Sequence, residues 1–214
     1  GTGAGQFLVP LIASALISAC GWRNAYLIIG GFVLAALVIF AQIMKRDPRD
    51  IGMLPDGRQQ GPEGGTSRTG GEGLSLRTAA RTMQFWGICL SEFAVFFCFF
   101  TIIVHIVPHA MDMGIKPAIA ASVISTIGGV SMLGRFIMGM ANDKIGGKRS
   151  LIVCFIILIS SIILLQFTDS TWMLFVFAFV YGFAHGGFFT VMSPTIAEFF
   201  GMDFHGQLFG TVLF

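Results

Sequence analysis

Six long apolar stretches dominate the sequence, and they constrain the fold more than any other feature. They are residues 6–20, 25–44, 85–107, 118–140, 150–167 and 172–192. A helix needs roughly 20 residues to cross the ~30 Å hydrocarbon layer of a membrane, and these stretches have about that length or nearly so. None alternates apolar and polar residues as a strand of a membrane β-barrel does. The stretches therefore predict an all-α integral membrane protein with six spans and the start of a seventh near Gly206.

The charged residues are few and unevenly placed. Only 11% of the residues are charged, against about 25% in soluble domains, and 55% are hydrophobic. Of the 13 basic residues, seven lie between residues 45 and 84 and three lie in "ANDKIGGKR", residues 141–149. Because cytoplasmic loops are enriched in Lys and Arg, we expect both segments on the cytoplasmic side of a multi-pass protein of the plasma (cell inner) membrane. Membrane lipid is the expected surrounding, and the net charge of +2 gives no indication of nucleic acid as a partner.

Residues 45–84 differ in composition from the apolar stretches on either side. They include "GRQQGPEGGTSRTGGEG", which is Gly-rich, polar and without a helical period. This composition predicts a flexible linker. The chain starts without Met inside an apolar segment and ends on the apolar "FGTVLF". We therefore expect it to be a piece of a longer protein.

Arg135 is one of two charged residues inside the predicted spans. Its helix carries small and polar residues on one face, at steps of three and four: Gly128, Ser131, Arg135, Gly139 and Asn142. An ionised side chain at the bilayer centre costs ~2.5–3.5 kcal/mol on insertion scales, so this face should turn toward the bundle. Two interpretations are open. Arg135 binds a substrate, or it is structural and reaches carbonyl groups or lipid head groups near the inner end of its helix.

Glu92 is the second charged residue inside a span, and its helix neighbours are apolar. It lies at a depth similar to that of Arg135, on the preceding helix. Three outcomes are open: an ion pair with Arg135, a neutral hydrogen-bonded glutamic acid, or a carboxyl group that carries a coupling proton. Burial without a charged partner favours the protonated form of a carboxyl group, which suits the last two outcomes.

Tyr181 and His185 lie one turn apart in the last complete span, among glycines. They can donate hydrogen bonds to a substrate in a central cavity, or they can be packed residues whose polar atoms are satisfied by neighbouring helices. The aromatic run at residues 96–100 is predicted to face lipid, and glycines inside the spans are predicted to allow close helix contacts. The four cysteines lack CxxC spacing, so we predict free thiols and no metal site.

No catalytic motif is found in the sequence. It has no H-E-x-x-H, no G-x-S-x-G and no G-x-x-x-x-G-K-[ST] pattern. We therefore do not expect an enzyme, and no cofactor is predicted. Since the phosphate-binding loop is among the missing patterns, transport by such a chain would use a gradient and not its own hydrolysis of ATP.

The segment "GMANDKIGGKR" carries the most specific motif. It resembles the G-x-x-x-D-R/K-x-G-R/K-R/K loop of the major facilitator superfamily, with Gly147 as an extra residue. In that family the loop joins helices two and three and recurs between helices eight and nine. The resemblance implies a cytoplasmic gating loop in which an aspartate and basic residues tie helix ends together until the bundle opens inward. The residues of this loop are Gly139, Asp143, Lys144, Gly146, Lys148 and Arg149.

Two further segments agree with this resemblance. "GWRNAYLIIGG" looks like the outer turn between helices five and six, and "SPTIAEFFGMDFHGQLFG" looks like the connection from helix ten to helix eleven. The chain then corresponds to part of a major-facilitator-type bundle, from about helix five to the start of helix eleven. Residues 1–44 would be the last two helices of the N-terminal bundle, residues 45–84 the cytoplasmic linker, and residues 85–214 the C-terminal bundle without most of its last two helices.

Within the superfamily, "RDPRDIGMLPDG", "HIVPHAMDMGI" and "GRFIMG" resemble the monocarboxylate transporter and oxalate–formate antiporter branch. In that branch an arginine of the eighth helix holds the substrate carboxylate, and Arg135 occupies the corresponding place. Some monocarboxylate carriers have an aspartate one turn before this arginine, where this sequence has Ser131. A proton relay at that position is therefore not expected.

The resemblance implies a secondary active transporter for a small organic anion such as a monocarboxylate, working by alternating access. Arg135 would bind the substrate with help from Tyr181 and His185, and coupling would be by proton symport or by anion exchange. One alternative is a superfamily transporter of a sugar, drug or organophosphate in which Arg135 is structural. A second alternative is a membrane receptor or scaffold that transports nothing.

Overall fold

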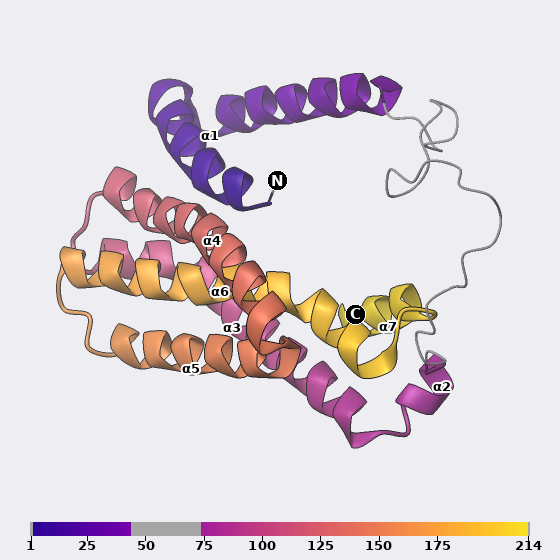
Figure 1. Cartoon of the computed structure of the whole chain (residues 1–214). Helices are drawn as coiled ribbons and strands as arrows, with labels where there is room; N and C mark the ends of the chain where they lie inside the picture. Colours follow the sequence, from indigo (N-terminus) through magenta and orange to yellow (C-terminus); the bar gives the residue numbers. More distant parts are fainter. Residues whose placement is uncertain (1, 44–73, 214) are drawn as a thin grey trace. The chain divides into compact units, whose positions relative to one another are not determined.

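Helix is the only regular secondary structure in the computed structural model, which describes residues 2–43 and 74–213 (Figure 1). The helices are α1 (Thr2–Ile43), α2 (Leu76–Ala79), α3 (Met83–Asp112), α4 (Pro117–Ile145), α5 (Gly147–Leu165), α6 (Thr171–Phe200) and α7 (His205–Leu213). No strand occurs in these two ranges, and the predicted all-α fold is confirmed.

Five of the helices, α1 and α3 to α6, are long and apolar enough to cross a membrane. The first two of the six predicted spans fall in α1, which runs from Thr2 to Ile43. A break at Gly21 separates them. Gly21 has φ 77° and ψ 161°, a conformation that residues with a Cβ rarely adopt, and the ribbon of α1 turns there (Figure 1). The helix α7 begins at His205, next to the predicted start of a seventh span.

The chain forms two compact units. One comprises Gly1–Ser14 and Gly70–Phe214, and the other comprises Ala15–Thr69. All the site residues predicted from the sequence belong to the first unit. The predicted division of the chain at residues 44 and 84 stays a prediction, and residues 45–73 of the predicted linker lie outside the described residues.

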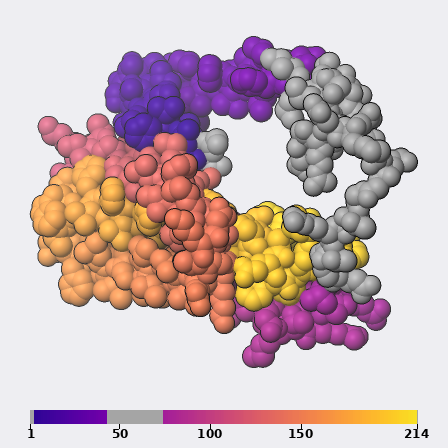
Figure 2. All heavy atoms as spheres, in the orientation of Figure 1, coloured from indigo at the N-terminus to yellow at the C-terminus, as the bar shows by residue number. Residues whose placement is uncertain are grey.

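The helix α6 lies between α4 and α5, and the atoms of these three helices form a continuous surface (Figures 1 and 2). Glycines bring α4 and α6 into backbone contact. A Cβ on Gly182 would lie 2.6 Å from the carbonyl oxygen of Ile127, and a Cβ on Gly186 would collide with the carbonyl of Ser131. The prediction that glycines inside the spans allow close helix contact is therefore confirmed for this pair of helices.

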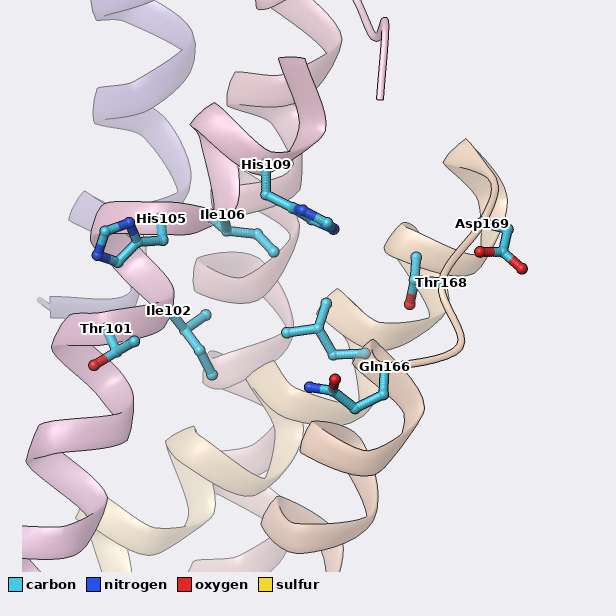
Figure 3. Close-up of a pocket in the computed structure, with 9 residues that line it drawn as sticks. Thr101, Ile102, His105, Ile106, His109, Gln166, Thr168 and Asp169 are labelled. Atoms are coloured by element: carbon cyan, nitrogen blue, oxygen red, sulfur yellow. The ribbon is translucent and has the colours of Figure 1, made fainter. Parts of the chain in front are cut away.

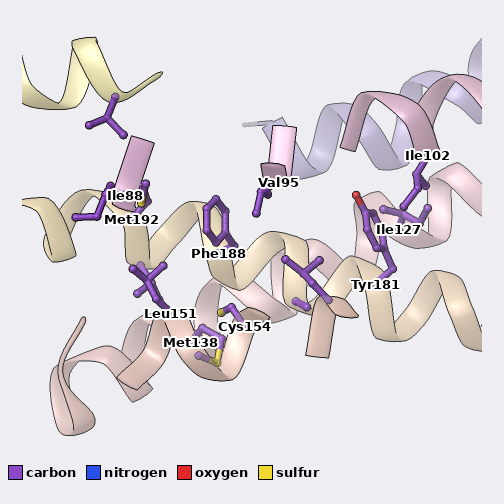
Figure 4. Packing of buried hydrophobic residues seen from close by; sticks show 14 of the residues in the cluster. Ile88, Val95, Ile102, Ile127, Met138, Leu151, Cys154, Tyr181, Phe188 and Met192 are labelled. Carbon is purple, nitrogen blue, oxygen red and sulfur yellow. The ribbon is translucent and has the colours of Figure 1, made fainter. Parts of the chain in front are cut away.

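The helix α3 packs on α6 through aromatic side chains. Phe96 meets Phe189 with ring centroids 5.3 Å apart, whereas Phe97 is 66% exposed. The prediction that residues 96–100 face lipid is therefore wrong for part of the run, because a helix turns successive residues to different faces. The buried face of α3 also carries Ile88, Val95 and Ile102 (Figure 4).

Candidate functional site

Arg135 lies in α4 where this helix contacts α6. Its neighbour Gly134 meets the backbone of Phe183, and a Cβ on Gly139 would lie 3.4 Å from Thr190. Arg135 is half-buried, and its Nε atom is buried without a hydrogen-bond partner. A buried donor left unpaired costs about 1–3 kcal/mol, and more when it is charged. The site therefore favours a ligand that supplies an acceptor.

His185 lies in α6 within a column of stacked rings. Its imidazole ring lies 4.5 Å from the ring of Phe99 in α3 and 5.8 Å from the ring of Tyr181, and it is nearly parallel to both. Phe189 meets it edge-on at 4.9 Å. Both ring nitrogens of His185 are buried and have no hydrogen-bond partner in the part of the chain that the structure describes. The two predicted residues are thus packed, but packing leaves the polar atoms of His185 unsatisfied.

Arg135 and His185 lie on α4 and α6, two helices whose backbones touch where Gly134 meets Phe183 and Gly186 meets Ser131. Each of the two residues has a buried nitrogen atom without a partner among the described residues. Tyr181 supports His185 by stacking on it. Phe99 belongs to the run that the sequence analysis predicted to face lipid, and this prediction is wrong for Phe99 because its ring stacks on His185. Steps of four and three from Glu92 place Phe99 on the same face of α3 as Glu92.

Glu92 is 2% exposed and lies in α3 on the same face as the buried Ile88 and Val95. Neither carboxyl oxygen has a hydrogen-bond partner, and no ion pair with Arg135 forms among the described residues. The ion pair left open by the sequence is therefore not present. Glu92 borders a cavity of about 270 Å³ between α3 and α7.

The predicted gating loop connects α4 to α5 through Gly146, which has φ 82°. Its charged residues, Asp143, Lys144, Lys148 and Arg149, are all exposed. The contact that holds this loop comes from Glu198 near the end of α6, whose Oε2 atom accepts a hydrogen bond from the backbone N–H of Gly147 at 2.7 Å. A Cβ on Gly147 would collide with Thr195. The extra glycine of the motif is thus the residue that lets α6 approach the start of α5.

Glu198 was missed by the sequence analysis. It lies 51 residues from Gly147 along the chain, so spacing does not connect the two. The one available signal is its position in the last turn of a predicted span, where the helix dipole favours a basic residue over an acidic one. An acidic residue there indicates an interaction with another helix start, which the structure shows to be α5.

A second cavity of about 470 Å³ opens between the last turns of α3 and the connection from α5 to α6 (Figure 3). His105 and His109 line it from α3, and Gln166, Thr168 and Asp169 line it from the other side. Both histidines are exposed. No group of three potential metal ligands occurs within the described ranges.

The whole chain, residues 1–214, matches the sequence profile of the Major Facilitator Superfamily. Among curated proteins, the chain is 27% identical to monocarboxylate transporter 12 of Rattus norvegicus over its full length, which covers 48% of the rat protein. It is 24% identical to monocarboxylate transporter 12 of Homo sapiens, over 100% of this chain and 46% of the human protein. It is 23% identical to monocarboxylate transporter 12-B of Danio rerio, over 100% of this chain and 49% of that protein. The chain spans about half the length of the curated relatives it matches. These matches confirm the resemblance read from the loop motif and the flanking segments.

Proposed function

The chain belongs to the major facilitator superfamily, and on that premise we propose that it is part of a secondary active transporter for a small organic anion. The substrate class is a monocarboxylate, moved across the plasma membrane by alternating access. The relatives named above are all monocarboxylate transporters, which supports this class. So do the five apolar helices, which suit a multi-pass membrane protein. No enzymatic chemistry is part of the proposal.

The observation that carries the proposal is the buried Nε atom of Arg135, which has no hydrogen-bond partner among the described residues and belongs to a helix whose backbone touches that of the His185 helix. A carboxylate satisfies a guanidinium group through two parallel charge-assisted hydrogen bonds, which no neutral solute can match. His185 can add a hydrogen bond from a ring nitrogen that no described residue uses. Its stacking between Phe99 and Tyr181 fixes the plane of the ring, so the bond is directed in advance.

The proposed transport cycle also needs a contact that forms and breaks at one end of the bundle. The hydrogen bond from Gly147 to Glu198 joins the start of α5 to the last turn of α6. We propose that it belongs to the cytoplasmic gate together with the exposed charges of the loop. Coupling of anion movement to a proton or to a second anion belongs to the same proposal.

The test is counterflow of labelled lactate in proteoliposomes that contain the full-length protein. Arg135→Lys keeps the charge but removes the bidentate geometry, so we expect the affinity for lactate to fall by about 10- to 100-fold, the equivalent of one charge-assisted hydrogen bond. Arg81→Lys, an exposed arginine before α3, is the matched control and should leave counterflow unchanged.

Two outcomes would contradict the proposal. Unchanged lactate affinity in Arg135→Lys would show that Arg135 has a structural role and would favour a transported solute of another class. A wild-type protein that exchanges no solute with the vesicle interior would favour a receptor or scaffold.

A further inference from the structure

Glu92 is the one carboxyl group buried inside a span among the residues that the structure describes. At 2% exposure it is out of contact with water on the protein surface, and neither of its oxygens accepts or donates a hydrogen bond. An ionised carboxylate in this state is strongly unfavourable in a membrane interior. The surroundings of Glu92 therefore hold the neutral acid, and the charged form needs a change in those surroundings.

The charged and titratable groups around Glu92 do not stabilise its anion. Cys89 lies on α3 itself, three residues earlier. The residues of α7 that face Glu92 across the cavity are Thr211, Val212 and Leu213, none of them titratable. The helix α6 packs alongside through Phe189, and none of its titratable groups, Tyr181, His185 and Glu198, contacts the Glu92 carboxyl group. Arg135 lies on the neighbouring α4 and forms no ion pair with Glu92.

A cavity lies beside Glu92, which is among the residues that line it. It measures about 270 Å³, which is room for several water molecules at ~30 Å³ each. Its walls are mostly the rings of α3, including Phe85, Trp86 and Phe93, so they offer few hydrogen bonds. The hydroxyl group of Thr211 is already bonded to the carbonyl of Gln207 at 2.8 Å. Glu92 is therefore the group in this cavity with unused hydrogen-bonding capacity.

We propose that Glu92 carries the coupling proton of the transport cycle, at a site separate from the anion site. The anion binds at Arg135 between α4 and α6, and the proton binds at Glu92 between α3 and α7. The carboxylate takes up one proton from water on one side of the membrane, crosses the cycle as the neutral acid, and releases the same proton on the other side. The bundle changes conformation when Glu92 is protonated because moving its charged form through the apolar interior is too costly. This proposal rests on the transport function proposed above.

The experiment compares two modes of lactate movement in proteoliposomes with the full-length protein. Glu92→Gln mimics the neutral acid and cannot release a proton. We expect Glu92→Gln to reduce the lactate accumulation that a pH gradient drives by at least 10-fold. Equilibrium exchange of lactate should stay within about 2-fold of wild type. Asp112→Asn makes the same chemical change at an exposed position of the same helix, and it should leave both modes unchanged.

The two modes separate the failure of this proposal from the failure of the transport function. Gradient-driven accumulation that survives Glu92→Gln overturns the proton site and leaves the transporter in place. A wild-type protein without lactate exchange overturns the transport function itself. Infrared difference spectra of wild type minus Glu92→Gln give a readout that does not depend on transport. They should contain the C=O stretch of a protonated carboxyl group at neutral pH, and its absence also overturns the proposal.

Discussion

Buried polar atoms without partners are the features of single residues on which the functional account depends. Those that it uses are Arg135 Nε, both ring nitrogens of His185 and both carboxyl oxygens of Glu92; Gln6, Asn142, Ser170 and His205 also bury a polar atom without a partner among the described residues. Each unsatisfied group costs about 1–3 kcal/mol. A ligand that satisfies the atoms of Arg135, His185 and Glu92 recovers this cost, which is why we assign them to substrate and proton.

Glu198 provides a prediction at the same scale. Glu198→Ala removes the acceptor for the N–H of Gly147, a charge-assisted bond worth about 1.5–3 kcal/mol where it is shielded from water and less at this partly exposed position. We expect faster hydrogen exchange of the amides at residues 147–151, measured by mass spectrometry on the full-length protein.

Glu198→Gln is the matched control for this change. Its amide oxygen can still accept the bond, so its effect should be smaller than that of Glu198→Ala. Equal exchange rates in wild type and Glu198→Ala would show that this contact does not hold the start of α5.

At the scale of helices, the contact between α4 and α6 carries the proposed anion site. The backbones touch at Gly182 and Gly186, and Arg135 and His185 lie on these two helices. A bulkier residue at either glycine would separate the helices along their length. The close approach of α4 and α6 thus depends on glycines, which have no chemical role of their own.

Gly182→Ala tests this packing. Its Cβ would lie 2.6 Å from the Ile127 carbonyl oxygen, so we expect a loss of stability of about 1–3 kcal/mol and weaker lactate affinity together. Gly87→Ala in α3 is the control, because nothing lies within 4 Å of its added Cβ and Ala favours a helix. Thermal unfolding in detergent measures the stability. A Gly182→Ala protein as stable as wild type would argue against backbone contact at this point.

Much of this arrangement could be predicted from sequence because it depends on local patterns. Hydropathy gave the spans, and steps of three and four along α4 placed Arg135 on the face that meets α6. The contacts of Glu198 with Gly147 and of Phe99 with His185 could not be predicted, because each joins residues distant in the chain. Such contacts depend on how whole helices pack against one another, and helix packing cannot be predicted from a local sequence pattern.

At the scale of the molecule, the two proposed sites lie on different helix pairs of one compact unit. The anion site uses α4 and α6, and the proton site uses α3 and α7. Phe99 and His185 connect the two pairs, since the ring of Phe99 on α3 stacks on His185 in α6. A movement of α3 on proton release would therefore displace the ring of His185, which is proposed to help bind the anion.

The central claim is that the carboxylate of the substrate pairs with the guanidinium group of Arg135, whose buried Nε atom has no partner among the described residues. The most direct measurement is competition against labelled lactate counterflow by unlabelled lactate and by lactamide, its uncharged amide of nearly the same shape. We predict that lactamide competes at least 10-fold more weakly than lactate, because it cannot form the paired charge-assisted bonds. Equal competition by the two compounds would contradict the claim.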